Sequence, residues 1–168
     1  MATAPELFAN VREVIIRPMR AADVPEVVAI ERASYQFPWS EGIFRDCLRV
    51  GYVCRVVTAE RQVMGYGVMS VGAGEAHILN LCIAEEFRCR GGGKKILICL
   101  LERAHAAGMA EAFLEVRPSN VMAIRLYQSL GFQQVGTRRG YYQAVSGRED
   151  AAVLKLSLPG AAPPTSQS

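Results

Sequence analysis

The chain has 168 residues, enough for one domain with a hydrophobic core and too few for two domains of ordinary size. Hydrophobic residues make up 51% and charged residues 21%, a balance that excludes a disordered chain. The net charge of +3 suits an anionic ligand or an RNA-bearing partner but identifies neither. No apolar run approaches the roughly eighteen residues of a membrane-spanning helix, so such a helix is excluded.

The cysteines indicate a reducing compartment. They are Cys47, Cys54, Cys82, Cys89 and Cys99, and no two have CxxC spacing. Their odd number, with an N-terminus unlike a signal peptide, predicts free thiols and a cytoplasmic protein. Four lie in apolar runs and should be buried, whereas Cys89 lies in a basic segment and should be exposed. With two histidines and no paired cysteines, no metal site is expected.

The first part of the chain is predicted to form a strand and two helices. These are a strand over Glu13–Met19, a helix that follows Asp23 and ends near Ser34, and a helix over Glu41–Leu48. Asp23 and Ser40 have side chains suited to capping the two helices. Between the helices, "FPWS" interrupts the helical pattern.

Three strands follow, over Tyr52–Ala59, Gln62–Val71 and Glu75–Ile83. The breaks between them are short and contain turn-forming residues, so neighbouring strands should be antiparallel. Gly65 and Gly67 inside the middle strand indicate a bulge or a close approach of two backbones.

The second part alternates between helices and strands. A helix that ends at Gly108 carries an apolar stripe made of Ile96, Leu97, Leu100, Leu101 and Ala104. It is followed by a strand over Glu111–Val116, a helix over Ser119–Gly131, and strands over Gln133–Arg139 and Ala151–Leu158. The order βααβββαβαββ predicts an α/β fold with a mixed sheet and helices on both faces. One domain is expected over residues 13–158, after an N-terminal extension (1–12) and before a disordered tail (159–168).

The segment "FRCRGGGKK" (87–95) predicts a phosphate site. A glycine-rich turn that opens a helix leaves backbone N–H groups free for an anion, and four basic residues surround this one. The mononucleotide loop GxxxxGK[ST] does not fit, because Arg88 stands where its first glycine should be and Lys95 follows Lys94. The dinucleotide fingerprint GxGxxG fits poorly, because Ile96 replaces its third glycine and antiparallel strands precede it.

The pattern [QR]-x-x-G-x-[GA] does fit, over Arg88–Gly93, and "FLEV" and "NVMAIRLYQSLGF" follow it. In this order the segments resemble the GNAT family of acetyl-CoA-dependent N-acetyltransferases, over roughly Ile15–Leu158. The resemblance implies antiparallel N-terminal strands, a central parallel pair and acetyl-CoA as co-substrate. Gly92 and Lys95 depart from the family's usual residues, and they should alter the strength of phosphate binding without moving the site.

The resemblance also implies roles for individual residues. Coenzyme-binding residues would be Leu81, Cys82, Ile83, Cys89, Arg90, Gly91, Gly92, Gly93, Lys94 and Asn120. Glu115 would be the base that takes the acceptor's proton, and Tyr127 the acid that protonates the coenzyme thiolate. Taken alone, Glu115 could instead be a strand carboxylate paired with Arg117, Tyr127 a core aromatic, and Asn120 a helix cap.

"FPWSE", "LEVRPSN" and "RRGYYQAVSGREDA" resemble the branch of that family that acetylates the N-terminal alanine of a small-subunit ribosomal protein. The implied partner is a protein N-terminus, that of a ribosomal protein. Five residues expected outside the regular elements would wall the acceptor site or pack locally: Phe37, Pro38, Trp39, Tyr141 and Tyr142. Nearby, Arg138, Arg139 and Arg148 are expected to be solvated.

Two other functions stay open. A GNAT enzyme could act on a small amine, although a polycationic substrate would favour acid-rich acceptor loops and the expected ones are not acid-rich. A non-catalytic acetyl-CoA-binding module would have no chemical need for Glu115 and Tyr127.

Overall fold

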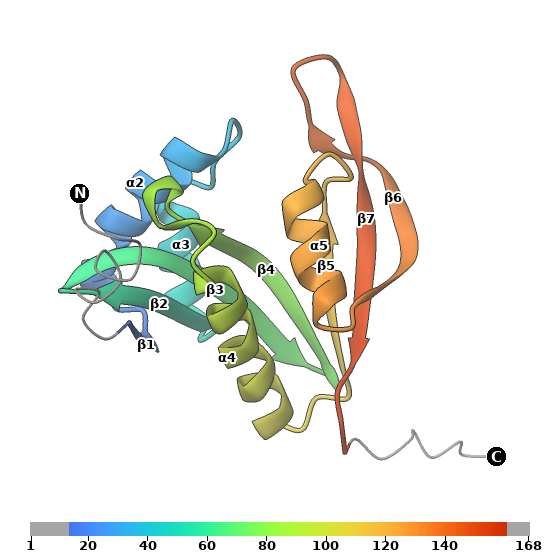
Figure 1. Cartoon of the computed structure of the whole chain (residues 1–168), viewed down its shortest axis with the longest axis horizontal. Coiled ribbons are helices and arrows are strands. Elements are labelled where there is room, and N and C mark those ends of the chain that lie inside the picture. The colour runs from blue at the N-terminus through green and yellow to red at the C-terminus, as the bar shows by residue number, and fades with distance from the viewer. Residues whose placement is uncertain (1–13, 161–168) are drawn as a thin grey trace, which may run out of the picture. The chain divides into compact units, whose positions relative to one another are not determined.

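The computed structural model describes residues 14–160. The helices and strands are β1 (Ile15–Pro18), α2 (Val24–Ser34), α3 (Glu41–Arg49), β2 (Val53–Ala59), β3 (Gln62–Gly72), β4 (Glu75–Ile83), α4 (Gly92–Ala106), β5 (Glu111–Val116), α5 (Val121–Ser129), β6 (Gln133–Gln143) and β7 (Arg148–Ser157) (Figure 1). The order βααβββαβαββ is confirmed. The sequence did not predict the two 3₁₀ turns, η1 (Ala21–Asp23) and η2 (Glu85–Phe87), and it ended β6 too early.

The strands form one seven-stranded sheet in the order β1-β2-β3-β4-β5-β7-β6. β4 and β5 are parallel, whereas β1 with β2, β5 with β7, and β7 with β6 are antiparallel. The predicted mixed sheet with a parallel pair is confirmed. The chain divides into two compact units: unit 1 comprises the residues up to Val68 with Leu81–Leu97, and unit 2 comprises Met69–Asn80 with the residues from Ile98 onward.

In unit 1, helices cover both faces of the strands. Val56 belongs to a buried cluster with Val24 of α2 and Phe44 of α3. Its neighbour Val57 belongs to a second cluster with Ile96 of α4. Because successive strand residues point to opposite faces, α2 and α3 lie on one face and the first turns of α4 on the other. The prediction of helices on both faces is confirmed for this unit.

β3 and β4 approach each other closely at Gly65. A Cβ atom on this residue would lie 2.5 Å from the Ile83 Cδ1 atom and 2.6 Å from the Cys82 carbonyl oxygen. The predicted close approach is therefore confirmed. Glycine is needed here because any side chain would push away the last residues of β4.

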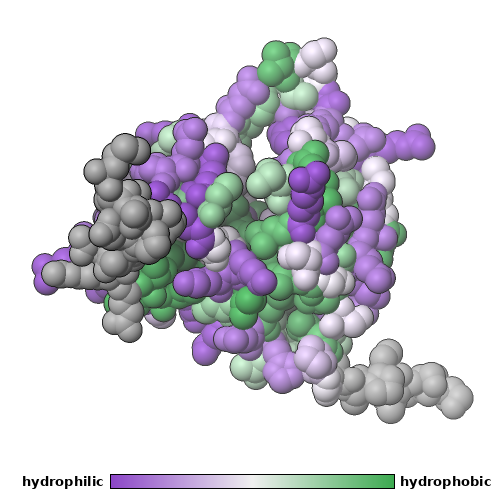
Figure 2. Space-filling view, in the orientation of Figure 1, coloured by the Kyte–Doolittle hydropathy of each residue, from purple (hydrophilic) through white to green (hydrophobic). Residues whose placement is uncertain are grey.

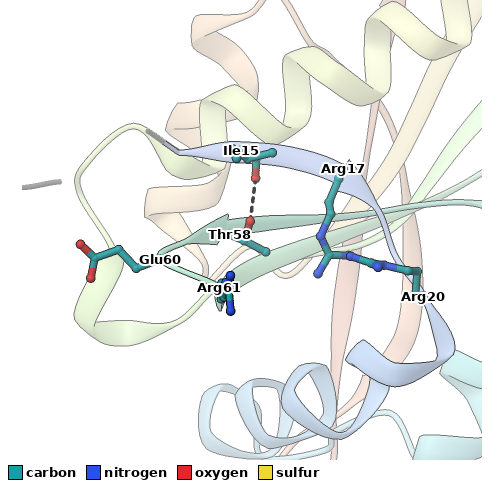
Figure 3. A pocket seen from close by; sticks show the side chains of 6 residues that line it. All are labelled: Ile15, Arg17, Arg20, Thr58, Glu60 and Arg61. Atoms are coloured by element: carbon teal, nitrogen blue, oxygen red, sulfur yellow. Dashed lines mark hydrogen bonds between the residues drawn. The ribbon is translucent and has the colours of Figure 1, made fainter. Parts of the chain in front are cut away.

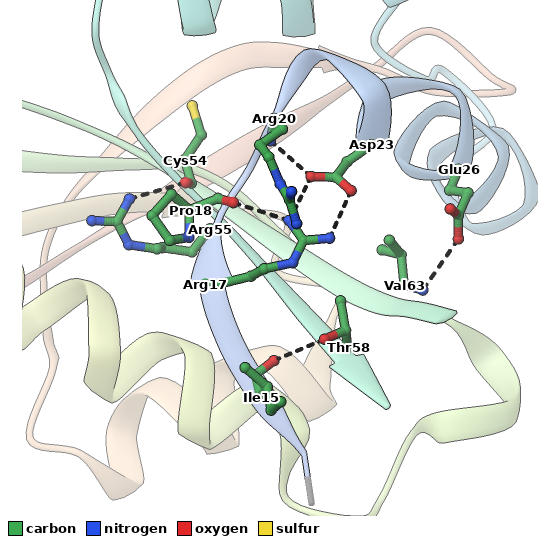
Figure 4. Close-up of polar contacts among 10 residues, drawn as sticks. All are labelled: Ile15, Arg17, Pro18, Arg20, Asp23, Glu26, Cys54, Arg55, Thr58 and Val63. Carbon is green, nitrogen blue, oxygen red and sulfur yellow. Dashed lines mark hydrogen bonds and ion pairs between the residues drawn. The ribbon is translucent and has the colours of Figure 1, made fainter. Parts of the chain in front are cut away.

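Asp23 does not cap α2 as predicted. Its carboxylate accepts two hydrogen bonds from the Arg17 guanidinium, at 2.7 and 2.8 Å, and one from the Arg20 N–H at 2.7 Å (Figure 4). The cap prediction was wrong because Arg17, on β1, binds the carboxylate that would otherwise accept from the helix N–H groups. The pair ties β1 to the start of α2. Ser40 does cap α3, since its hydroxyl accepts from the Ile43 N–H at 3.3 Å.

Unit 2 contains the strands β5, β7 and β6, with α5 following β5. β7 pairs with β5 on one side and with β6 on the other, and the β6–β7 hairpin extends past α5 (Figure 1). Gly108 and Gly131 follow α4 and α5 with φ of +79° and +99°, left-handed values that end a helix at little cost for glycine.

The burial predictions are confirmed for Cys47, Cys54 and Cys82, which are buried, and for Cys89, which is exposed, whereas Cys99 is only partly buried. On the face in Figure 2, hydrophilic residues predominate and hydrophobic ones are exposed between them. Every helix within residues 14–160 is too short or too polar to cross a bilayer. The predicted N-terminal extension and nearly all of the predicted tail lie outside the described residues.

We expect Asp23→Asn to destabilise the fold by about 1–3 kcal/mol at neutral pH, because it removes a charged acceptor from three hydrogen bonds. Hydrogen bonds from Arg17, opposed by burial, hold the Asp23 pKa below its usual value. This stabilisation is therefore complete above the carboxylate's ordinary pKa of about 4 and is lost as the pH falls through its lower folded value. Urea unfolding from about pH 7 to pH 3 should show the two proteins converging in acid. A constant difference across that range would contradict the assignment.

Candidate functional site

The glycine-rich segment forms the turn between β4 and α4. Cys89 and Gly91 have left-handed φ values of +62° and +79°, and α4 begins at Gly92. The Lys95 N–H bonds to the Gly91 carbonyl oxygen at 3.1 Å, so the N–H groups that precede it in the first turn lack partners within the helix. This arrangement fits a bound phosphate group, which needs exposed N–H donors at a helix start.

Arg88, although exposed, braces this turn. Its Nε atom donates to the Ile83 carbonyl oxygen at 2.9 Å, and one terminal nitrogen donates to the Ser34 hydroxyl at 3.1 Å. Arg88 thus joins the turn to the end of β4 and to α2. Three further exposed cations lie beside the glycines: Arg90, Lys94 and Lys95.

The last residues of β4 carry the main-chain groups predicted to meet the coenzyme. Cys82 is buried, and the Leu81 carbonyl oxygen accepts a hydrogen bond from the Tyr35 hydroxyl at 3.1 Å. Tyr35 follows α2 and precedes "FPWS" by two residues, so this bond connects the end of α2 to β4. The sequence did not identify Tyr35, because its partner is 46 residues away.

The "FPWS" segment is anchored by a buried carboxylate. Glu31, 2% exposed, accepts from the Trp39 N–H at 3.0 Å and from the Tyr66 hydroxyl. The Trp39 ring packs against Phe44, with centroids 5.3 Å apart. For Trp39, the structure therefore shows the local packing that was one of its two interpretations. Phe37 remains 43% exposed.

Glu115 lies on β5 and has two polar partners in unit 2. Its Oε1 atom is 2.9 Å from Arg138 Nε, and the Tyr141 hydroxyl donates to the same carboxylate. This hydrogen bond is the main reason why the Tyr141 pKa lies above its usual value. The side chain of Glu115 is only 23% exposed. The suggested pairing with Arg117 was wrong, whereas Arg138, expected to be solvated, is 60% exposed but also paired with Glu115.

Arg117 instead pairs with Glu149, at 3.1 Å, and lies over the Tyr142 ring at 4.4 Å. Glu149 also accepts from the Ser119 N–H at 3.1 Å. Hydrogen bonds from Ser119 and Arg117 hold the Glu149 pKa below its usual value. Tyr142 is largely enclosed, and burial raises its pKa.

Tyr141 and Tyr142 lie within β6, not outside the regular elements as predicted. The ladder between β6 and β7 shifts between Arg138 and Tyr142, at Gly140, whose φ is +57°. The Gly140 N–H donates to the Asp150 carboxylate at 2.8 Å, and Arg148 donates to the carbonyl oxygens of Gly140 and Tyr141. Arg148, expected to be solvated, therefore holds an irregular strand in place. The turn closes with a 3.2 Å bond from the Ala144 N–H to the Gly147 carbonyl oxygen.

Tyr127 and Asn120 belong to α5. Tyr127 is 8% exposed, and its ring meets Phe132 edge-on, with centroids 5.9 Å apart. Tyr127 also contributes to the electrostatic environment of Tyr142. The Asn120 side chain accepts from the Ala123 N–H at 3.2 Å, so its predicted role as a helix cap is confirmed.

A separate depression of about 430 Å³ lies on unit 1 (Figure 3). It is lined by Ile15, Arg17, Arg20, Thr58, Glu60 and Arg61. Three of these residues are arginines, but the Arg17 charge is already neutralised by Asp23. Within residues 14–160 there is no group of three or more His, Cys, Asp or Glu side chains placed to hold a metal ion.

Comparisons with known proteins identify the family. Residues 19–132 match the acetyltransferase (GNAT) family. The chain is 34% identical over 140 residues to the [ribosomal protein bS18]-alanine N-acetyltransferase of Salmonella typhimurium, covering 83% of this chain and 95% of that one. A related putative enzyme from Bacillus subtilis is 28% identical over 145 residues, covering 85% of this chain and 95% of the other.

Solved structures agree. The ribosomal-protein-S18-alanine N-acetyltransferase of Escherichia coli superposes with a TM-score of 0.82 at 32% identity, covering 87% of this chain and 94% of the other. Ard1 from Thermoplasma volcanium superposes with a TM-score of 0.79 at 27% identity, covering 86% and 97%. The chain therefore belongs to the GNAT family of acetyl-CoA-dependent N-acetyltransferases.

Proposed function

We propose that this enzyme acetylates the α-amine of a protein N-terminus, most specifically the N-terminal alanine of the small-subunit ribosomal protein bS18. The observation that carries the proposal is the likeness to bS18-alanine N-acetyltransferases, which extends over 95% of such an enzyme at 34% identity. The site in unit 2 supports it, because a half-enclosed carboxylate on β5 is suited to receive an ammonium group.

Acetyl-CoA would be held by unit 1. The N–H groups in the first turn of α4 would bind its pyrophosphate, with Arg90 and Lys94 adding charge. Main-chain groups of Leu81, Cys82 and Ile83 would bind the pantetheine arm and the thioester. A GNAT protein from Salmonella typhimurium has been solved with acetyl-CoA.

Glu115 would act as the base. An α-ammonium has an ordinary pKa near 8 and must lose a proton before it can attack a thioester. Glu115 takes this proton, directly or through a water molecule, as the new C–N bond forms. The carboxylate is already paired with Arg138 and accepts a hydrogen bond from Tyr141, so it is held in one orientation on β5.

Tyr127 would act as the acid. When the C–S bond breaks, the sulfur leaves as a thiolate and requires a proton, which the Tyr127 hydroxyl supplies. Packing of its ring against Phe132 fixes the phenol on α5. Asn120 would contact the coenzyme in addition to capping α5.

Small amines and N-terminal peptides are separable as substrates by one experiment. Incubation of the enzyme with acetyl-CoA and a panel of alanine-first peptides, polyamines and aminoglycosides, followed by mass spectrometry, should show acetylation at the peptide α-amine. Acetylation of the small amines alone would replace the proposed function with small-molecule acetylation. No acetylation of any acceptor would leave acetyl-CoA binding without the proposed transfer.

We expect Gly91→Val to lower acetyl-CoA affinity roughly tenfold or more. The left-handed backbone at this position disfavours a side chain by about 1–2 kcal/mol, so the N–H groups of the turn should shift away from the pyrophosphate. Lys94→Ala should cost less, because Lys94 is exposed and its charge is screened. Calorimetric titration should give this ranking.

The matched control for this prediction is Gly74→Val. Gly74 has the same φ of +79° and equally open space around its Cβ position, but it lies in the β3–β4 turn. It should lose stability without losing acetyl-CoA affinity. A larger loss of affinity in Lys94→Ala than in Gly91→Val would show that side-chain charge, not the backbone, dominates binding.

We expect Glu115→Gln to slow the chemical step by roughly 10²–10⁴-fold, because the amide keeps the shape but loses the basicity. Acetyl-CoA affinity should be unchanged, and raising the pH should partly restore the rate as more acceptor amine becomes neutral. Tyr127→Phe should also slow this step while the fold survives. Single-turnover assays with an alanine-first peptide from about pH 6 to pH 9 report both effects. Wild-type rates in both variants would show that the two residues are structural.

A further inference from the structure

The carboxylate proposed as the base is already paired with a permanent cation. Arg138 Nε lies 2.9 Å from Glu115 Oε1, and the two side chains differ in exposure: that of Arg138 is 60% exposed and that of Glu115 is 23% exposed. The acid is thus partly enclosed, while its partner reaches it from the solvent side. An arginine does not give up its proton in a protein, so Arg138 cannot itself take part in proton transfer.

Strand register explains how Arg138 reaches Glu115 across a neighbouring strand. On β7, Val153 pairs with Glu115 on one side and with Gly136 on the other. Arg138 follows Gly136 by two residues and therefore points to the same face as Glu115. Its own partner on β7 is Ala151, whose small side chain leaves room for the arginine to cross.

The same place is where an acceptor ammonium would have to bind. Glu115 has one oxygen on Arg138 and also accepts from the Tyr141 hydroxyl. An ammonium that gives its proton directly to this carboxylate must come within hydrogen-bonding distance of it. Arg138 and the acceptor therefore compete for one carboxylate.

We propose that Arg138 is an exchangeable counter-ion of Glu115, which pairs with the carboxylate until the α-ammonium of the acceptor replaces it. The proposal rests on the proposed function, because it takes Glu115 to be the group that receives the acceptor. One cation replaces another, so the partly enclosed carboxylate is never left without a counter-charge. The replacement costs little, because ion pairs with so exposed a partner contribute about 0–1 kcal/mol.

The Tyr141 ring can bind the guanidinium of Arg138 after it leaves Glu115. The Arg138 guanidinium carbon lies 5.6 Å from the centre of the Tyr141 ring, within the range of a cation–π contact. Arg138 can therefore leave the carboxylate and keep a favourable neighbour. The pairing with Arg138 also makes Glu115 selective for a charged acceptor. A neutral acceptor terminus gains too little from the carboxylate to displace an arginine.

The test compares Arg138→Gln with Arg139→Gln. Both substitutions remove one exposed positive charge from β6, but it is Arg138 that pairs with Glu115, so only the first removes the competitor. With a short alanine-first peptide, Arg138→Gln should lower the peptide KM by roughly three- to fivefold and change kcat by a smaller factor. Arg139→Gln should leave the KM near that of the wild type. A raised KM in Arg138→Gln would overturn the proposal, and so would an equal fall in both variants.

A binding experiment separates this proposal from the base role of Glu115. Peptide affinity is measured calorimetrically with the CoA-bound enzyme, in the wild type, Arg138→Gln, Glu115→Gln and the double variant. The gain from Arg138→Gln should disappear in the Glu115→Gln background and for the N-acetylated peptide, which carries no α-ammonium. A gain that persists in either case would refute the exchange. If Glu115→Gln keeps full activity while the coupling is observed, the base role fails and the counter-ion role stands.

Discussion

The arrangement of unit 2 depends on β7, which is hydrogen-bonded to β5 on one side and to β6 on the other. This double register places Glu115 and Gly136 on either side of Val153. Side chains alternate along a strand, so a slip of one residue on either side would turn Glu115 or its partners to the opposite face. The position of the carboxylate is therefore a property of three strands rather than of β5 alone.

In unit 1, side-chain contacts stabilise the turn between β4 and α4, which has little regular structure. Left-handed residues at Cys89 and Gly91 direct the chain into α4, and Arg88 hydrogen-bonds the turn back to Ile83 and Ser34. Gly65 supports the same strand end from β3, where nothing larger would fit. Arg88 thus has a structural role, and the glycines after it leave the start of α4 open.

Much of the fold could be predicted from local sequence, because periodicity and turn formers report on neighbours along the chain. The element order, the glycine helix ends and the close approach at Gly65 all follow from such signals. The partners of charged side chains do not. Asp23 looked like a helix cap because its competitor, Arg17, acts from a strand.

The site was predicted as a set of residues but not as a set of contacts. In the sequence, the segment around Gly140 and the charged run that follows it resembled a loop. Tyr141 and Tyr142 nevertheless lie in β6, next to a bulge. No local pattern shows that Glu115 meets Arg138 or that Arg117 meets Glu149, since each pairing needs the register of separate strands. The candidate acid and the coenzyme contacts were inferred from family resemblance, which periodicity could not have supplied.

The stem and the tip of the β6–β7 hairpin differ in how far they tolerate sequence change. In its stem, Arg148, Glu149 and Asp150 direct consecutive side chains back onto β6 and the segment before α5. At its tip, Val145 is 83% exposed and the turn is closed by a backbone hydrogen bond. Mutation at the tip can accumulate over evolutionary time without disturbing the carboxylate, whereas the stem must be inherited as a block. Sequence change can thus arise by drift at one end of a hairpin whose other end is held fixed.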